Sequence, residues 1–349
     1  MNRAKIEELP IYGEYDAIVS GGGLIGVTCA VALGRSGKRV ALVERRSTLG
    51  WELVRARRIL GWPPAENPIS STYAADIAKA QSLGSRQGMG FNAPAVELEL
   101  DRWVLEANVD VMFHGWPQKV TESGEQVDGL VVGTKEGYVR LLAPLVVETD
   151  DSGRLIDSSI PRLAVSRPIW RSCLLHDAVL SGNRVLEHDN GRHISLRPLS
   201  EDHCRVDIPL KGEDLQSRDL EFHAALLEAL PLIRGEYGCE SAKLYYLAEE
   251  EWAQPSFRLS AEAKTEGEPV IGQRMQGSFP SGRVLSQAPQ RLTSRHMVAS
   301  HIKGLVLGGP WLPSYLDISA DSEEAGMVNR VLLGESIAAF AGCMVMSKA

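Results

Sequence analysis

The sequence predicts an α/β protein in which a parallel-sheet domain is interrupted by a second, β-rich α+β domain. Three observations predict this arrangement. A strand, a glycine-rich turn, a helix and another strand follow one another between residues 15 and 44. The middle of the chain alternates strand-like runs with helices, and a buried strand and a long helix near the C-terminus return to the α/β pattern. We therefore expect residues 1–160 and 291–349 to form the first domain and residues 161–290 the second.

The first element is the strand that begins at Tyr15 and runs into a turn containing three glycines. Gly21 permits a tight strand-to-helix turn, Gly23 lets the backbone approach a phosphate, and Gly26 lets the helix pack close to the strand. Phosphate groups bind at such helix N-termini because unpaired N–H groups and the helix dipole favour an anion. A purely structural turn in an α/β sheet is the alternative interpretation.

The residues after this turn favour the nucleotide interpretation. An apolar helix over Leu24 to Gly34 is followed by a strand that ends at Glu44, 18 residues after Gly26. A carboxylate at that place can accept hydrogen bonds from both hydroxyls of a ribose, and it disfavours a 2′-phosphate. The segment therefore predicts a dinucleotide-binding βαβ unit.

The rest of the first 160 residues extends this domain. The spacing predicts a helix over Leu98 to Asn108 and a strand over Val109 to His114. Short strands follow at 117–120 and 129–133, and residues 138–147 continue the sheet pattern, so we expect an inserted antiparallel meander. The arginines that follow Glu44 in the sequence, Arg55, Arg57 and Arg58, either run along a cofactor or form a solvated basic helix face.

The middle of the chain predicts an antiparallel sheet capped by helices. Helical segments are expected at Trp170–Leu180 and Leu215–Leu232. Strands are expected at Arg192–Leu199, Cys204–Leu210 and Lys243–Glu249. The acidic run at 249–251 is interpreted as a solvated edge rather than a metal site, and no metal is expected elsewhere.

The C-terminal part predicts a return to the first domain. Residues 304–309 form a short apolar run that ends in two glycines, as a buried strand does at a ligand-binding edge. Capping residues at Ser319 and Asp321 then open a long helix that reaches about Ala341.

Composition limits the classes of function. A net charge of -8 disfavours nucleic acid as a partner, because binding to phosphates needs clustered positive charge. No uninterrupted apolar run is long enough for a membrane span, and the N-terminus lacks the apolar stretch of a signal peptide, so we expect a cytoplasmic protein. Five widely spaced cysteines without a C-x-x-C pattern indicate free thiols, most of them buried.

The segment from Asp16 to Gly26, with Glu44 and Gly50 beyond it, resembles the FAD-dependent oxidoreductase family, in particular its glutathione-reductase-like flavoproteins. The resemblance implies a discontinuous, Rossmann-like FAD-binding domain with a second β-rich α+β substrate domain. It implies that FAD is the cofactor, with the diphosphate at the glycine turn, the ribose at Glu44 and the flavin near the late glycines. The implied cofactor-binding residues are Gly21, Gly23, Leu24, Ile25, Gly26, Glu44, Arg45, Gly50, Trp51, Glu52, Val120, Gly308, Gly309 and Ile318.

The chain departs from this family at three places. Trp51 stands where family members commonly have a second glycine, and Pro310-Trp311 stands where they have an acidic residue. The strand end that usually reads Ala-Thr-Gly corresponds here to Glu148-Thr149-Asp150. Acidic side chains beside a diphosphate would repel it, so either this loop turns outward or FAD binding is weakened.

The resemblance implies an FAD-dependent oxidoreductase that acts on a small organic substrate by hydride transfer to or from flavin. His296 and Tyr315 are the candidate catalytic residues, since a nearby group must exchange the substrate proton. An electron-acceptor protein or a second copy of the chain are possible partners. The alternatives are a degenerate nucleotide-binding scaffold or partner subunit without flavin chemistry, and an NAD-dependent dehydrogenase.

Overall fold

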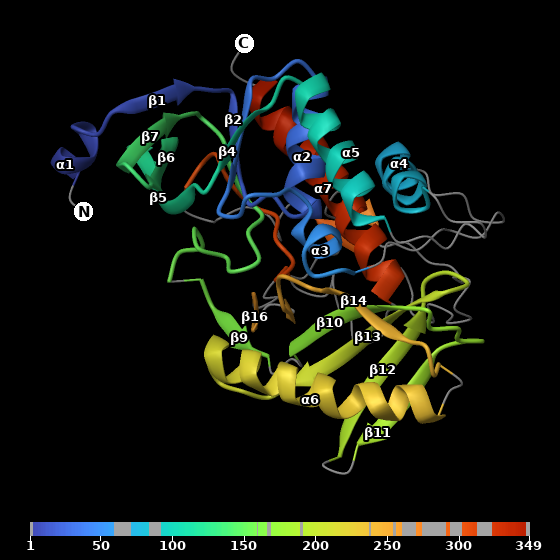
Figure 1. The fold of residues 1–349 in the computed structure, drawn as a ribbon. Coiled ribbons are helices and arrows are strands. Elements are labelled where there is room, and N and C mark those ends of the chain that lie inside the picture. The colour runs from blue at the N-terminus through green and yellow to red at the C-terminus, as the bar shows by residue number, and fades with distance from the viewer. Residues whose placement is uncertain are drawn as a thin grey trace.

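The computed structural model describes most of the chain and shows two packed regions, each built on its own sheet (Figure 1). The described residues are 3–58, 71–83, 92–158, 160–165, 169–188, 191–236, 239–253, 256–259, 270–273, 291–293, 302–312 and 323–346.

The first region is built on a parallel sheet whose strands follow the order β19-β8-β2-β3-β4. These strands are β2 (Ala17–Ser20), β3 (Val40–Glu44), β4 (Asp110–Phe113), β8 (Val146–Glu148) and β19 (Leu305–Leu307). Nearly all of β2, β3, β8 and β19 is buried, because helices cover a parallel sheet on both faces. The predicted strand–helix–strand unit is present, with α2 (Leu24–Arg35) between β2 and β3.

The helices of this region include α5 (Ala93–Glu106) and α7 (Glu323–Met346), which run beside α2 in Figure 1. The shorter helices are α1 (Arg3–Glu7), α3 (Trp51–Val54) and α4 (Thr72–Gln81). Helices α2 and α7 approach closely at Gly334, where a Cβ atom would lie 2.4 Å from the carbonyl oxygen of Ile25. The glycine therefore lets the last helix pack directly on the first helix of the βαβ unit.

A smaller sheet with the order β1-β7-β6-β5 lies beside the parallel sheet. Its strands are β1 (Ile11–Glu14), β5 (Trp116–Ser123), β6 (Gln126–Thr134) and β7 (Gly137–Leu142). The predicted meander is formed by the antiparallel strands β5, β6 and β7. The run 138–147, predicted as one continuation of it, divides instead: β7 stays in the meander, and β8 joins the parallel sheet beside β2.

The second region is a sheet with the order β11-β12-β13-β10-β14, to which β15 adds at β10. Its strands are β10 (Ile169–His176), β11 (Arg184–His188), β12 (Arg192–Pro198), β13 (His203–Leu210), β14 (Lys243–Leu247) and β15 (Trp252–Ala253). Helix α6 (Leu215–Glu236) packs along the face turned away from the first region (Figure 1). The predicted helix α6 and the predicted strands β12, β13 and β14 are all present.

The predicted helix at Trp170–Leu180 is wrong, because residues 169–176 form strand β10. Cys173 and Leu175 pack into the core under α6, while Ser172 and Leu174 face the first region. Side chains that alternate between two faces are typical of a strand. Pairing of β10 with β13 on one side and β14 on the other holds these residues in the strand conformation. The sequence of a short apolar segment does not by itself distinguish a helix from a strand.

The chain leaves the first region after β8 and returns to it at β19, which pairs with β8 in parallel. The discontinuous α/β domain with a second β-rich α+β region is therefore confirmed. Short pairs β9 (Arg162–Ala164) with β16 (Phe257–Leu259), and β17 (Val270–Gln273) with β18 (Arg291–Thr293), lie in the intervening stretch.

The cysteines and the apolar helix α7 bear on the predictions of free thiols and of no membrane span. All cysteines are free; Cys29, Cys173, Cys204 and Cys239 are buried and Cys343 is exposed. Residues Gly326–Met344 of α7 are long and apolar enough to cross a membrane by length and composition, but 56% of the most apolar window is buried in the protein. The packing of α7 on α2 makes it a core helix of this fold.

Candidate functional site

The glycine turn before α2 has the geometry that a dinucleotide-binding loop requires. Gly21 adopts a φ of +100°, which side-chain-bearing residues rarely adopt. A Cβ atom on Gly26 would lie 1.8 Å from the carbonyl oxygen of Gly21, so the turn closes only with a glycine there. Thr149 clamps the same turn from β8, since its hydroxyl donates to the carbonyls of Ser20 at 2.7 Å and Gly21 at 3.0 Å.

Glu44 lies at the end of β3, beside this turn, and is 1% exposed. One carboxylate oxygen accepts a hydrogen bond from the backbone N–H of Gly22 at 2.5 Å, and the other accepts from the N–H of Arg46 at 2.7 Å. Burial raises the pKa of Glu44, and the neighbouring Arg46 opposes that rise. Glu44 is therefore placed where a ribose-binding carboxylate belongs, with both oxygens engaged by the protein.

Glu52 lies at the N-terminus of α2, the place where a diphosphate binds in such folds. Its two oxygens lie 3.2 and 3.1 Å from the backbone nitrogen of Leu24, which donates to them. The guanidinium of Arg330, from α7, lies 3.3 Å from the same carboxylate. Glu52 and Arg330 are 1% and 2% exposed, and burial raises the pKa of Glu52 while Arg330 opposes the rise. A protein carboxylate thus occupies the anion position of this helix.

Trp51 closes the remaining space of the cradle, by which we mean the hollow around the turn from Gly21 to Gly26. Its ring lies 5.7 Å from that of Trp252 in β15, and the guanidinium of Arg46 lies 4.2 Å above it. The cradle retains about 10 Å³ of free volume, which is about the space that one water molecule needs. Its lining residues are Gly21, Gly23, Ile25, Glu44, Arg46, Trp51, Glu52, Thr149, Asp150, Asp151 and Arg330.

The backbone and the donor set of the cradle therefore fit a dinucleotide, whereas the space between the side chains does not. The glycine turn, the helix N-terminus that Glu52 now occupies and Glu44 are the parts that would hold FAD. A ligand of that size needs a cavity of several hundred cubic ångströms, so Trp51 and Glu52 must move before it can enter.

The acidic segment Glu148-Thr149-Asp150 at the end of β8 places its two carboxylates in different surroundings. Glu148, the last residue of β8, is fully buried, and burial together with the charge of Asp150 raises its pKa well above the usual range. Asp150 does line the cradle, and it lies 3.6 Å from the guanidinium of Arg45. The loop does not turn outward as a whole, since Asp150 is 3% exposed.

The other proposed cofactor-binding residues lie around this centre. Gly50 begins α3 with a left-handed φ of +57°, and its N–H donates to the carbonyl of Gly22. A Cβ atom on Gly308 would lie 2.4 Å from Ile337 of α7, and one on Gly309 would lie 2.3 Å from Trp311, so tight packing requires both glycines. Val120 is buried in β5 and is not among the residues that line the cradle. Ile318 and the candidate catalytic residues His296 and Tyr315 lie outside the described residues.

The arginine stretch and the acidic run at 249–251 meet, so Arg57 and Arg58 do not form the solvated face that is one of their two interpretations, and the run is paired with arginines although Glu249 stays exposed. Arg57 and Arg58 are 7% and 4% exposed. Glu249 lies 3.5 Å from Arg57, and Glu250 lies 3.1 Å from Arg55 and 2.7 Å from Arg46. Glu251 binds Arg218 of α6 at 2.8 Å. The pairs made by Glu249 and Glu250 join the two regions, whereas the pair of Glu251 with Arg218 lies within the second region.

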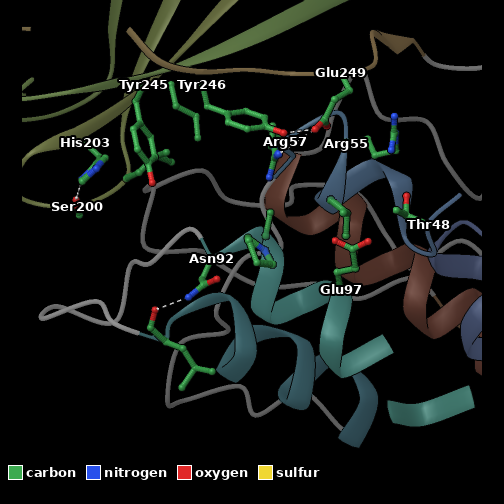
Figure 2. Close-up of a pocket in the computed structure, with 16 residues that line it drawn as sticks. Thr48, Arg55, Arg57, Asn92, Glu97, Ser200, His203, Tyr245, Tyr246 and Glu249 are labelled. Carbon is green, nitrogen blue, oxygen red and sulfur yellow. Dashed lines mark hydrogen bonds and ion pairs between the residues drawn. The ribbon is translucent and has the colours of Figure 1, made fainter. Parts of the chain in front are cut away.

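A cavity of about 650 Å³ lies between the two regions, next to α3 (Figure 2). Tyr245, Tyr246 and His203 enter it from the sheet of the second region, and Asn92 and Glu97 from the opposite side. The lining residues are Thr48, Val54, Arg55, Arg57, Leu83, Asn92, Ala93, Pro94, Glu97, Leu174, Leu199, Ser200, His203, Tyr245, Tyr246 and Glu249. Helix α3 separates the cavity from the cradle, since Val54 faces the former and Trp51 the latter.

Sequence reasoning missed this cavity. His203 Nδ1 lies 2.7 Å from an Asp202 oxygen and 3.1 Å from the Ser200 hydroxyl, and Tyr245 stacks edge-on against the imidazole at 5.5 Å. The available signal was the alternation of β13, which places His203 on the face opposite to Cys204. Among the described residues, no group of three or more His, Cys, Asp or Glu side chains is arranged to hold a metal ion.

Comparisons with known proteins bear on the family and on the fold of this chain. Residues 16–159 match the model of a family described as FAD dependent oxidoreductase. No match is found among curated protein sequences. The match covers β2, α2, Glu44 and the Thr149 clamp, and so every part of the cradle except Arg330.

Several solved structures share the fold at low sequence identity. p-Nitrophenol 4-monooxygenase PnpA from Pseudomonas putida has a TM-score of 0.60 and 14% identity, with 97% of this chain and 82% of that chain covered. A geranylgeranyl bacteriochlorophyll reductase-like protein from Thermoplasma acidophilum has a TM-score of 0.54 and 14% identity over 96% of this chain and 80% of that one. The flavin-dependent brominase Bmp2 has a TM-score of 0.53 and 12% identity over 94% and 79%. The fold of this chain is that of these solved structures, and the family match over residues 16–159 supports FAD as the cofactor and an FAD-dependent oxidoreductase as the enzyme class.

Proposed function

We propose that the protein transfers a hydride between a small organic substrate and the flavin of FAD. The observation that carries the proposal is the glycine turn before α2, with Glu44 beside it, inside the stretch that matches the family. The discontinuous domain supports the finer assignment to glutathione-reductase-like flavoproteins. When FAD is bound, its flavin supplies the redox chemistry, and the protein supplies position and electrostatics.

The residues of the chain have separate roles in this proposal. The N-terminus of α2 holds the diphosphate, and Gly23 leaves room for it to approach. Glu44 accepts the hydroxyls of the ribose, and Arg45 neutralises Asp150 beside it. Gly308 and Gly309 remain the residues proposed for the flavin side.

The 650 Å³ cavity is the proposed substrate pocket, since its volume suits a small organic molecule and it borders α3. The tyrosines that line it suit a planar ring, and the monooxygenase of similar fold acts on p-nitrophenol. His203, oriented by Asp202, is proposed to exchange the substrate proton. His296 and Tyr315 stay predictions from the sequence.

The experiment that tests the proposal is the visible spectrum of the protein, purified without added cofactor and then incubated with FAD. The two bands of an oxidised flavin that remain after gel filtration, with FAD released on denaturation, are the expected result. Bleaching of these bands by a candidate substrate without oxygen then measures hydride transfer. Reoxidation by oxygen alone, or only with an added one-electron acceptor, distinguishes an oxidase from an enzyme that needs a partner protein.

A second candidate is a nucleotide-free scaffold or partner subunit, and the filled cradle favours it. With about 10 Å³ free, the folded state offers a dinucleotide no space until α3 moves. Protein that stays colourless after long incubation with FAD, and that forms a stable complex with another protein, would support the scaffold against the enzyme.

The location proposed for the protein is the cytoplasm. Four buried cysteines and one exposed cysteine are present as free thiols, and a reducing compartment preserves such thiols. Cell fractionation with a tagged full-length chain tests this assignment.

A further inference from the structure

We propose that the N-terminus of α2 and Arg330 form a diphosphate site that Glu52 closes, and that a diphosphate enters by displacing the Glu52 side chain. The ligand is either inorganic diphosphate or the diphosphate of a dinucleotide. Only the dinucleotide case rests on the function proposed above.

The first argument is that Glu52 is held as a bound anion would be. The backbone N–H of Leu24 donates to its two oxygens at 3.2 and 3.1 Å. One of these oxygens lies 2.7 Å from where a Cβ atom of Gly23 would stand, so the carboxylate uses the space that this glycine leaves open. The helix of 12 residues directs its dipole at the same point. The position therefore already binds negative charge.

The second argument is the guanidinium of Arg330, which comes from α7 at the other end of the chain. It is 2% exposed, lines the cradle and lies 3.3 Å from Glu52. Its Nε has no hydrogen-bond partner among the described residues. A buried cation costs several kcal/mol unless an anion compensates it, so the cation needs an anion at this point whether Glu52 supplies it or not.

The third argument concerns how Glu52 can leave. It lies in α3, a single turn of four residues that begins at Gly50 in the left-handed region. Movement of this turn would take both Trp51 and Glu52 out of the cradle, because they are adjacent in it. An entering diphosphate would replace one anion by another between the same helix end and Arg330, so the buried positive charge stays compensated.

The test measures binding of inorganic diphosphate and of FAD to the full chain by isothermal titration calorimetry. In Glu52→Gln the position keeps its shape and loses its charge, so we expect diphosphate to bind roughly tenfold more tightly than to the unaltered protein. Adding Arg330→Gln to this variant should remove the gain. Glu251→Gln is the matched control, because Glu251 also pairs with a partly buried arginine, Arg218, but lies outside the cradle.

The outcomes separate this inference from the proposed function. Unchanged diphosphate affinity in Glu52→Gln and in Glu52→Asp, whose carboxylate is too short to reach Leu24, would overturn the inference; the second variant serves if the first does not fold. Equal FAD affinity in the unaltered protein and in Glu52→Gln would also overturn it while leaving the flavin function intact. A gain for diphosphate without FAD binding by any variant would support the site and count against the flavin function.

Discussion

Glu250 and Arg46, 204 residues apart in the chain, are joined by a 2.7 Å hydrogen-bonded ion pair between the second region and the loop that follows Glu44. Arg46 also lies 3.4 Å from Glu44 and covers Trp51. The position of the second region and the closure of the cradle are therefore connected through one guanidinium.

Replacing Glu250 by Gln should lower the free energy of unfolding by about 1–3 kcal/mol, because Arg46 is largely buried and would lose its closest carboxylate. Urea unfolding measures the change. Glu125→Gln is the control, since Glu125 is exposed and its nearest ion pair, with Lys303, is 4.0 Å long. Equal losses in both variants would show that the pair stabilises the protein no more than an exposed pair does.

Replacing Gly26 by Ala should prevent formation of the turn, because the new Cβ atom would stand 1.8 Å from the carbonyl oxygen of Gly21. We expect a loss of soluble folded protein or a destabilisation of more than about 3 kcal/mol. The far-ultraviolet circular dichroism signal during thermal unfolding reports it. Gly235→Ala in α6 has open space around the new methyl group and should be neutral or slightly stabilising.

Trp51→Gly removes the indole that fills the space beside the glycine turn and should open the cradle. FAD should bind more tightly and more rapidly than to the unaltered protein, because the indole that covers the site is gone. The variant should also lose about 3–5 kcal/mol of stability, since Trp51 is 4% exposed. Trp116→Gly, at a tryptophan that is 41% exposed, should leave FAD binding as it is. If the two variants bind FAD alike, volume at residue 51 is not what limits entry.

Glu148 should make the protein less stable as pH rises above about 4.5, the ordinary value for a glutamate. The pKa of Glu148 is higher in the folded state than in the unfolded chain. At any pH between these two pKa values the folded chain binds more protons than the unfolded one, so the free energy of unfolding falls as pH rises. In Glu148→Gln this contribution disappears, and the curve of unfolding free energy against pH should be flatter. Urea unfolding from pH 4.5 to 8 gives the slopes, and identical slopes would contradict the assignment.

His203→Gln should slow the bleaching of bound flavin by substrate about 100-fold or more if His203 exchanges the substrate proton. The spectrum of bound FAD should not change, because His203 lines the cavity and not the cradle. His193→Gln, on the exposed surface of β12, is the control. A normal rate in His203→Gln would show that His203 does not exchange the substrate proton and would leave His296 and Tyr315 as the candidates.

The sequence predicted the elements whose signals are local. The glycine turn, the strand ending at Glu44 and the amphipathic helix α6 each depend on neighbours a few residues away. Strand β10 was predicted as a helix because its outcome depends on pairing with β13 and β14, which lie far along the chain.

The same reason explains what was missed at the site. The contact between Glu52 and Arg330 spans 278 residues, and Arg57 and Arg58 are buried against the second region, where they pair with Glu249 and Asp207. In each pair, the sequence around one residue does not indicate which distant residue it contacts. Family resemblance identified Trp51 and the Glu148 segment as departures, but only the packed side chains reveal that Trp51 fills the cradle and that Glu148 is fully buried.

The close packing of Gly334 against Ile25 has a consequence for biosynthesis. On the ribosome, the βαβ unit emerges first, yet the free edge of β8 and the outer side of α2 have no cover until β19 and α7 have been translated. The nucleotide domain therefore begins folding early and finishes last, after the whole β-rich insertion has left the exit tunnel. Nascent chains stopped before residue 305 leave the edge of β8 unpaired. An unpaired strand edge can pair with other chains, so we expect chaperones to bind these nascent chains.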